Sequence, residues 1–432
     1  MTTLGIVGGR VLQPDQSIEH ADVLVDQETG TIEAIGEIPM PDDTLDAENG
    51  LVIPGLINAH THVAMTLLRG AADDKPLDTW LEEDIWPIEA ALQPDDVAAG
   101  SRLAAAEMIR SGTTAFADMY FMMEKVASMV EAAGLRARLG HGCITVGKDD
   151  QAAHEDFETG LDFALEYDGA AGGRIKTMLT PHSLTTVDEE FYREYVPRAH
   201  EHDIPVHIHA NETAAEVNPI VDQHGQRPLA YADDLGVLGP DSFLAHCVHI
   251  EDDEIALLAD RNTGVVHCPA SNMKLASGIA PVQAMLDAGI AVGLGTDGPA
   301  SNNDLDMFDE IRDAAMVGKL AADDASAIAA GTAVDLATAG SATVAGLDGG
   351  HIAVGAAADL AVVDLASPHL TPEHDLVSHL AYAARGSDVR HTICDGQVLM
   401  RDREVLTIDV EAARADAATH AEQLFERADS PD

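Results

Sequence analysis

Positively charged residues are scarce in this sequence of 432 residues, which contains only six lysines. Lysine and arginine together number 24 against 75 aspartates and glutamates, and the formal net charge is −51. The acidic residues are spread along the whole chain, so they do not form an acidic tail. Such a surface repels nucleic acid and anionic membranes, which argues against both as partners. Because salt screens this repulsion, with a Debye length of about 3 Å at 1 M, we expect a halophile-type protein of the cytoplasm.

Cysteine motifs and long apolar runs are also missing. The four cysteines form no CxxC pair, which argues against a disulfide framework and against a thiolate zinc site. No run reaches the roughly 18 apolar residues that a membrane span requires, and the first residues lack the basic segment of a signal peptide. We therefore expect a soluble, cytoplasmic protein. Hydrophobic residues make up 46 % of the chain, which is ample for a large core.

The middle of the chain, residues 57–345, alternates short apolar segments with helical patterns. Eight candidate strands lie near residues 57–62, 113–118, 137–145, 174–180, 205–210, 242–247, 263–268 and 290–297. Eight β–α units in series predict an α/β fold, the (β/α)8 TIM barrel. A doubly wound open sheet is the alternative, and the absence of GxGxxG after an early strand argues against it.

Both ends of the chain have a different pattern, with short strands separated by turns. Residues 1–56 and 346–432 together predict one small β-sandwich domain built from both termini. The last stretch, from about Val410, is rich in alanine and acidic residues and predicts a terminal helix. The expected domains are therefore a barrel of residues 57–345 and a composite β-domain with a C-terminal helix.

Ionisable side chains follow the predicted barrel strands, at positions far apart in the sequence. The segment INAHTHVAMTLLRG, residues 57–70, places His60 and His62 on one face at the end of the first strand. An isolated HxH is equally typical of two buried core histidines. The later strands, however, are followed in the same way by His182, His207, His209, Glu212, His246, His249, His267 and Asp297. Because chemistry in such barrels lies at the carboxyl ends of the strands, the pattern favours a metal site.

The predicted ligands are His60, His62, His209 and Asp297. Three imidazoles and one carboxylate are donors suited to Zn²⁺ or Fe²⁺, and a water molecule bound there would have its pKa lowered towards about 7. His207 competes with His209 for the ligand role because both lie on one strand face. We prefer His209 because Glu212 follows three residues later and can bring a carboxylate back over the site.

Several longer motifs resemble those of the amidohydrolase superfamily. They are PGLINAHTH, HxxE, AHCVH and GLGTDGPASNN, with the more specific MTLLRGAADDKPLDTWLEEDIWPIE and SNMKLASGIAPV. Over nearly its whole length the chain resembles the 5′-methylthioadenosine/S-adenosylhomocysteine deaminase branch, which includes 5′-deoxyadenosine deaminases. The resemblance implies a metal-dependent hydrolytic deaminase that converts adenosine-type nucleosides to the inosine analogue and ammonia. It also implies one Zn²⁺ per subunit, with Fe²⁺ as the alternative, and a homo-oligomer.

The resemblance assigns the metal to His60, His62, His209 and Asp297. Glu212 would protonate the ring nitrogen beside the attacked carbon, and His246 would orient the water or help to deprotonate it. Asp297 would pass a proton to the departing ammonia. These residue types suit the reaction, because a partly desolvated carboxylic acid can be tuned for proton transfer near neutral pH.

The resemblance also implies a set of residues that bind substrate. Glu89 would bind the ribose hydroxyls, which suits one carboxylate that accepts two hydrogen bonds. Trp80 would pack near the sugar, and His182 would contact the substrate. Glu212 and Asp297 would contact it as well. On residue type alone, Glu89 could equally be an exposed helix glutamate and Trp80 a core residue.

The sequence departs from this branch where arginines grip the amino-acid tail of S-adenosylhomocysteine. His141 stands where an arginine is usual, and no arginine lies between Arg138 and Arg174. Lys148 could substitute only as a point charge on a flexible stem. The candidate substrates are therefore 5′-deoxyadenosine, 5′-methylthioadenosine, S-adenosylhomocysteine and adenosine. One metal is favoured over two, because Lys176 lies near the beginning of the fourth strand, whereas binuclear relatives have a lysine at its end.

Two other functions remain open at this point. A guanine deaminase or an s-triazine-type chlorohydrolase could use the same scaffold and the same metal. A catalytically silent barrel that acts as a binding subunit is the alternative from another class. The cytidine-deaminase type of fold is excluded, because it needs HxE with PCxxC and the sequence has no such pair.

Overall fold

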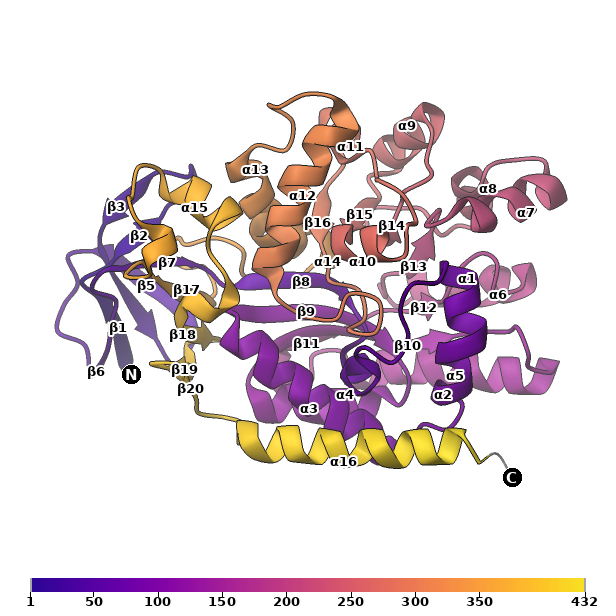
Figure 1. Cartoon of the computed structure of the whole chain (residues 1–432), viewed down its shortest axis with the longest axis horizontal. Helices are drawn as coiled ribbons and strands as arrows, with labels where there is room; N and C mark the ends of the chain where they lie inside the picture. The colour runs from indigo at the N-terminus through magenta and orange to yellow at the C-terminus, as the bar shows by residue number, and fades with distance from the viewer. Residues whose placement is uncertain (1, 431–432) are drawn as a thin grey trace.

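The computed structural model describes residues 2–430, which form a barrel with a β-sandwich at one side (Figure 1). The barrel strands are β8 (Leu56–Thr61), β9 (Thr113–Tyr120), β10 (Arg136–Cys143), β11 (Ile175–Thr177), β12 (Thr180–Pro181), β13 (His207–Ala210), β14 (Phe243–His246), β15 (Gly264–His267) and β16 (Val292–Leu294). All eight predicted strands are present, and the fourth is split into β11 and β12. The predicted barrel is confirmed.

The barrel consists of two parallel halves that are joined at both seams. One half has the order β11-β10-β9-β8, with β12 also paired to β10, and the other has the order β13-β14-β15-β16. Single bridges, Leu179 with Val206 and Ser183 with His209, join the halves at one seam. At the other seam Thr61 pairs with Asp297, whose backbone N–H donates to the His60 carbonyl over 3.0 Å. The first and last strands therefore meet at predicted metal ligands.

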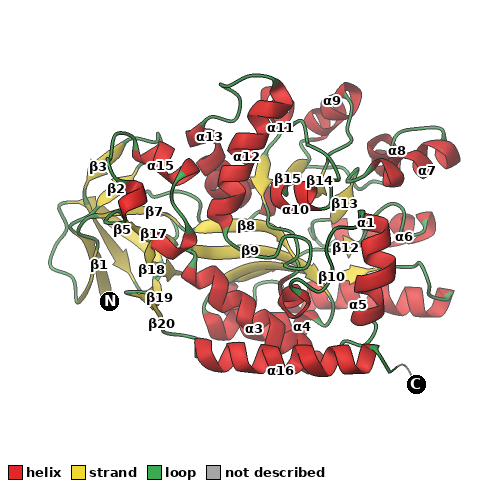
Figure 2. Ribbon diagram, in the orientation of Figure 1, coloured by secondary structure: helices red, strands yellow, loops and turns green. Residues whose placement is uncertain are grey.

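Helices cover the outside of the barrel, as Figure 2 shows. The longer ones are α3 (Pro94–Arg110), α4 (Met123–Ala133), α5 (Asp150–Tyr167), α6 (Glu189–His200), α7 (Ala214–His224), α9 (Asp252–Arg261), α12 (Met307–Ala322) and α16 (Val410–Ala428). The shorter ones are η1 (Val63–Leu68), α1 (Leu77–Trp80), η2 (Leu81–Ile85), α2 (Trp86–Glu89), η3 (Ala171–Gly173), α8 (Pro228–Asp234), α10 (Pro269–Lys274), α11 (Val282–Asp287), α13 (Ala330–Asp335), η4 (Leu336–Gly340), α14 (Ser341–Ala345), η5 (Pro368–Leu370), α15 (Leu376–Tyr382) and η6 (Gly386–Asp388). No helix among residues 2–430 is long and apolar enough to cross a bilayer.

Local sequence signals explain where helix α3 begins and how closely it packs. Pro94 occupies its first turn, and Gln93 and Asp96 form a capping box that satisfies backbone N–H groups at its start. Gly100 lies against η1, where a Cβ atom would come within 2.5 Å of the Ala64 carbonyl oxygen. Only a glycine permits this approach, so α3 can pack η1, the segment that directly follows His62, against the barrel.

Strands from both chain ends build the β-sandwich, as predicted. The N-terminal strands are β1 (Thr3–Val7), β2 (Arg10–Leu12), β3 (Ile18–His20), β4 (Asp22–Asp26), β5 (Thr31–Gly36), β6 (Asp43–Asp46) and β7 (Gly50–Pro54). The C-terminal strands are β17 (Leu360–Asp364), β18 (Val389–Cys394), β19 (Gln397–Arg401) and β20 (Glu404–Val405). One sheet has the order β5-β4-β1-β6 and the other has the order β20-β19-β18-β17-β7-β2-β3. Apolar residues of the two sheets share one core cluster, which includes Leu4, Val23, Val52 and Leu360.

The C-terminal helix α16 runs along the barrel helices and lies beside α3 (Figure 1). Asp96, which is almost fully buried, accepts a hydrogen bond from His420 over 2.8 Å and forms an ion pair with Arg427. Arg102 of α3 pairs with Asp416 at 2.8 Å. The domain boundaries at residues 56/57 and 345/346 stay a prediction.

Candidate metal centre and active site

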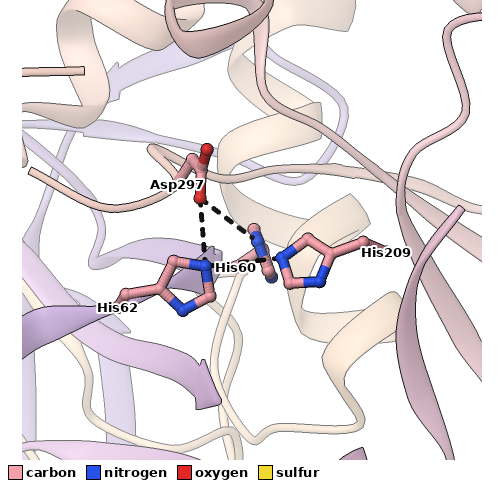
Figure 3. Close-up of side chains that lie close together, drawn as sticks. All are labelled: His60, His62, His209 and Asp297. Atoms are coloured by element: carbon pink, nitrogen blue, oxygen red, sulfur yellow. Dashed lines mark hydrogen bonds and ion pairs between the residues drawn. The ribbon is translucent and has the colours of Figure 1, made fainter. Parts of the chain in front are cut away.

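Four side chains converge at the carboxyl ends of the first, fifth and last barrel strands. His60 comes from β8, His62 follows this strand directly, His209 comes from β13 and Asp297 from the loop after β16. Their donor atoms all lie within 4.8 Å of one another (Figure 3). The Nε2 atom of His62 is 3.2 Å from Asp297 Oδ1 and 3.4 Å from His209 Nε2, and His60 Nε2 is 3.5 Å from Asp297 Oδ1.

Main-chain carbonyls determine the protonation of two of these rings. The Nδ1 atom of His62 lies 2.7 Å from the Met119 oxygen, and the Nδ1 atom of His209 lies 2.9 Å from the His182 oxygen. A carbonyl only accepts, so each Nδ1 must carry the proton. In the neutral rings, Nε2 therefore carries a lone pair that points at the common centre.

A second histidine, His207, determines which nitrogen of His60 carries the proton. The Nδ1 atom of His207 donates to the Phe243 oxygen over 2.8 Å, so its Nε2 atom accepts from His60 Nδ1, also over 2.8 Å. The Nε2 atom of His60 is then a buried lone pair without a hydrogen-bond partner among the described residues. His207, which the sequence made a rival of His209 for the metal, lies behind His60 and orients it.

Asp297 is held with one oxygen directed at the three rings. Its Oδ2 atom accepts hydrogen bonds from the hydroxyls of Ser271 at 2.6 Å and Ser301 at 2.7 Å, which leaves Oδ1 beside His60 and His62. Burial raises the pKa of this carboxyl, but the neighbouring rings of His60 and His62 lower it well below its usual value. Asp297 is therefore ionised and supplies a negative charge to the centre.

These four groups fit a divalent metal ion. Three of the donor pairs lie 3.2–3.5 Å apart, and lone pairs at this separation would repel one another unless a cation lay between them. Zn–N bonds of about 2.0–2.1 Å place tetrahedral donors about 3.3–3.4 Å apart, which matches these separations. Without a metal, a proton takes the place of the cation: burial lowers the pKa of His62, yet Asp297 raises it to about 9, so the centre attracts positive charge. The four residues form a metal-binding site.

A cavity of about 550 Å³ opens above this centre. The predicted ligands His62, His209 and Asp297 line it, and His60 lies behind them. The other predicted site residues line the same cavity: Trp80, Glu89, His182, Glu212 and His246. The structure thus brings together the residues to which the resemblance assigned a role in metal binding, catalysis or substrate binding.

Glu212 and His246 lie side by side in this cavity. Their Oε2 and Nε2 atoms are 3.5 Å apart, and Ser277 donates a hydrogen bond to Glu212 Oε1 over 3.3 Å. Burial raises the pKa of Glu212, which favours a protonated carboxyl. The Nδ1 atom of His246 donates to the side-chain oxygen of Asn272 over 2.9 Å, so its Nε2 atom is a lone pair within the site.

Glu89 has a partner that the sequence did not suggest. The hydroxyl of Tyr120, at the end of β9, donates to Glu89 Oε1 over 2.6 Å. Burial raises the pKa of Glu89 to about 7, although this hydrogen bond acts to lower it. Tyr120 is itself 4 % exposed, so it fixes the carboxylate at the cavity wall and leaves the second oxygen for a ligand.

Trp80 and His182 form other parts of the wall. The indole N–H of Trp80 donates to the Ala72 carbonyl over 3.2 Å, and the ring is 3 % exposed. The ring of His182 lies 4.7 Å from that of His209, and burial lowers its pKa to about 4. His182 is therefore a neutral ring whose Nδ1 atom pairs with the Thr186 hydroxyl at 2.8 Å.

His141 and Lys148, considered above as substitutes for an arginine, do not line the cavity. The Nε2 atom of His141 is 3.0 Å from one oxygen of Asp156, and the Nζ atom of Lys148 is 2.5 Å from the other. Asp156 therefore binds both groups on the outer side of this strand end.

The comparisons with known proteins agree with this geometry. The model of the Amidohydrolase family matches residues 51–399. The chain belongs to the amidohydrolase family. It is 64 % identical to a 5-methylthioadenosine/S-adenosylhomocysteine deaminase of Haloarcula marismortui, over 99 % of this chain and 100 % of that protein. It is 48 % identical to a 5′-deoxyadenosine deaminase of Methanosarcina acetivorans, over 97 % of each chain.

A solved structure of this amidohydrolase fold contains zinc. It is an adenosine deaminase from Xanthomonas campestris with bound Zn, with a TM-score of 0.94 and 37 % identity. The match covers 98 % of this chain and 99 % of that chain. The family and branch that the motifs predicted are therefore confirmed.

Several positions in the centre have no counterpart in the sequence predictions. They are Tyr120, His207 as an orienting group, Ser271, Asn272 and Ser301. Ser271, Asn272 and Ser301 stand within the motifs SNMKLASGIAPV and GLGTDGPASNN, which offered a signal. Tyr120 ends an apolar strand and offered none.

We expect His209→Ala to lose the metal. The variant removes one of four donors, and loss of even an outer partner of a metal ligand costs about 10–100-fold in affinity. Metal analysis after desalting should find less than about a tenth of the wild-type content. His224→Ala changes another histidine at the same cavity and should retain the metal. Full metal content in His209→Ala would contradict the assignment.

Proposed function

We propose that this amidohydrolase deaminates adenosine-type nucleosides at carbon 6, which yields the inosine analogue and ammonia. The observation that supports it most is the 64 % identity, over whole chain lengths, to a 5-methylthioadenosine/S-adenosylhomocysteine deaminase. The candidate substrates are 5′-deoxyadenosine, 5′-methylthioadenosine, S-adenosylhomocysteine and adenosine. Water attacks carbon 6, the C–O bond forms, the C–N bond breaks, and the amino group leaves as ammonia.

The metal proposed for the centre is one Zn²⁺ per subunit, with Fe²⁺ as the alternative. Three neutral imidazole nitrogens and a carboxylate suit either ion, and the similar adenosine deaminase of Xanthomonas campestris contains zinc. When bound, such an ion lowers the pKa of a water molecule to about 7 and so supplies a nucleophile at neutral pH. His60, His62, His209 and Asp297 would hold it.

Glu212 is the proposed proton shuttle. Its buried carboxyl has a raised pKa, so it can hold the proton that the ring nitrogen beside carbon 6 needs during attack. Ser277 holds Oε1, and Oε2 faces the His246 side of the cavity. A proton delivered to the ring lets the attacked carbon accept electrons without charge building up on the nucleoside.

His246 and Asp297 are the proposed bases. Asn272 keeps the Nε2 lone pair of His246 in the cavity, where it can orient the attacking water and take its proton. The Oδ1 atom of Asp297 is directed at the same centre, since two serines occupy Oδ2. Asp297 can therefore pass a proton to the departing amino group.

Glu89, Trp80 and His182 are the proposed binding groups for the nucleoside. The carboxylate of Glu89 accepts hydrogen bonds from the ribose hydroxyls, and Tyr120 holds it in place for this task. Trp80 supplies an apolar wall beside the sugar, and the neutral ring of His182 contacts the base or its amino group. Glu212 and Asp297 contact the same base.

The competing functions have weaker support. A triazine hydrolase from Arthrobacter aurescens has the same fold, with a TM-score of 0.90, but at 24 % identity this likeness concerns the fold alone. A guanine deaminase from C. acetobutylicum is 22 % identical. A silent binding subunit would not need a proton-holding glutamate beside a complete metal-binding set. Assembly into a homo-oligomer stays a prediction.

The decisive experiment measures ammonia release from a panel of compounds in molar KCl, with metal analysis of the same preparation. The high salt screens the charge of −51. Adenosine and its 5′-deoxy, 5′-methylthio and 5′-homocysteinyl forms should release ammonia, whereas guanine and chlorotriazines should not react. Turnover of guanine or triazines in place of the nucleosides would reject the proposal.

Glu212→Gln should retain the metal and lose turnover. The amide keeps the size of the side chain but cannot shuttle a proton, and general acid catalysis is worth about 10²–10⁴-fold in rate. We therefore expect kcat to fall by about this factor at unchanged metal content. A kcat equal to that of the wild type would show that Glu212 transfers no proton.

Tyr120→Phe should weaken nucleoside binding more than adenine binding. The variant removes the hydrogen bond that holds Glu89, and bonds to charged groups are worth about 1.5–3 kcal/mol. We expect steady-state kinetics to give a roughly tenfold weaker apparent affinity for 5′-deoxyadenosine, which keeps both ribose hydroxyls. The apparent affinity for free adenine, as substrate or competitor, should change little. An equal loss for both compounds would mean that Glu89 does not bind the ribose.

A further inference from the structure

A second group of potential metal donors lies next to the first and shares one residue with it. His60, His246 and Cys268 each have a donor atom within 4.8 Å of the other two, and none of the three residues is exposed by more than 1 % of its surface. They come from the ends of β8, β14 and β15. Nothing in the proposed deamination uses the thiol of Cys268.

The two histidines present unpartnered nitrogens to this second position. The Nε2 atoms of His60 and His246 are buried and have no hydrogen-bond partner among residues 2–430. His207 holds the Nδ1 atom of His60, and Asn272 holds that of His246, so both Nε2 atoms are lone pairs. A buried nitrogen lone pair without a partner is costly. The resident ion would satisfy that of His60, and that of His246 is open to a second ligand.

The donor chemistry differs between the two positions. His60, His62, His209 and Asp297 offer imidazole and carboxylate, whereas His60, His246 and Cys268 offer two imidazoles and a sulfur atom. Sulfur donors select soft, thiophilic ions, and carboxylate favours harder ones. With Zn–S bonds of about 2.3 Å, tetrahedral donors lie about 3.4–3.6 Å apart, so the group needs to close by at most about 1.4 Å.

We infer that His60, His246 and Cys268 form a second, thiol-containing metal position, which binds thiophilic divalent ions such as Cd²⁺. Occupation of this position excludes the resident ion, because the Nε2 atom of His60 can bind only one of them. As the ion binds, the S–H bond of Cys268 breaks, a bond from sulfur to the metal forms, and the proton passes to solvent. No oxidation is involved.

An ion at this position inactivates the enzyme in two ways. It removes His60 from the resident ion, and it occupies the Nε2 lone pair of His246 that faces the cavity. Ions reach it through the cavity that His246 lines. Thiophilic ions should therefore displace the resident ion and inhibit the enzyme. They should not yield an active enzyme in which they take the place of the resident ion.

The test titrates Cd²⁺ into the metal-loaded protein and follows three signals. They are the ultraviolet absorption of a thiolate–cadmium bond, the release of the resident ion, and X-ray absorption at the cadmium edge. We expect the thiolate band to grow in step with metal release, and a sulfur atom in the coordination shell of cadmium. These signals do not depend on deamination, so they stand even if the proposed substrate is wrong.

Cys268→Ser is the matching variant, and Cys247→Ser is its control. Cys247 is a second fully buried thiol, next to His246, but it belongs to neither donor group. Cys268→Ser should lose the band and should need roughly tenfold or more Cd²⁺ for half-release of the resident ion, whereas Cys247→Ser should behave like the wild type.

Two results would overturn the inference. The first is the finding that, in the wild-type protein, cadmium replaces the resident ion and has no sulfur atom in its own coordination shell. This measurement requires no variant. The other is a thiolate band that is as strong in Cys268→Ser as in the wild type, or that grows while the resident ion stays bound.

Discussion

The Nδ1–H groups of the three histidine ligands point away from the centre, and this orientation determines where the metal binds. His62 and His209 each use one nitrogen to donate to a main-chain carbonyl, and His60 donates to His207. The barrel backbone thus forces three lone pairs towards one point, where Asp297 adds a charge. A proton on any of these Nε2 atoms would compete with the metal, so metal affinity depends on the carbonyls as well as on the histidines.

The contacts that close the barrel between its first and last strands involve the metal ligands themselves. The backbone N–H of Asp297 bonds to the His60 carbonyl, and the Thr61 hydroxyl donates to the Asp297 carbonyl over 2.9 Å. Gly295 makes this contact of first and last strands feasible, since a Cβ atom there would come within 2.6 Å of the His60 oxygen. The contact between the last strand and the first therefore brings Asp297 next to His60 and His62, which are far from it in the sequence.

The sequence predicted the parts of this centre that follow from periodicity and residue type. The strands were visible as apolar runs, and their ends carried the ionisable residues. Neutral partners such as Tyr120, Ser271 and Ser301 were not predicted, because hydroxyl groups are common and their roles depend on neighbours from other strands. The choice of His209 over His207 rested on a single spacing, whereas the structure decides it by which nitrogen each ring presents.

Two of the scarce basic residues, Arg136 and Arg138, connect separate parts of the fold. Arg136 of β10 binds Asp359 and Asp395 at 2.7 Å each, and so ties the barrel to the β-sandwich. Arg138 donates to carbonyl oxygens of Thr177 and Gly346. By contrast, the described residues that line the cavity include seven acidic residues besides Asp297 and neither lysine nor arginine. The cavity therefore offers several carboxylate acceptors and no lysine or arginine, which suits a ligand rich in hydroxyl and amino donors, such as a nucleoside, better than an anionic one.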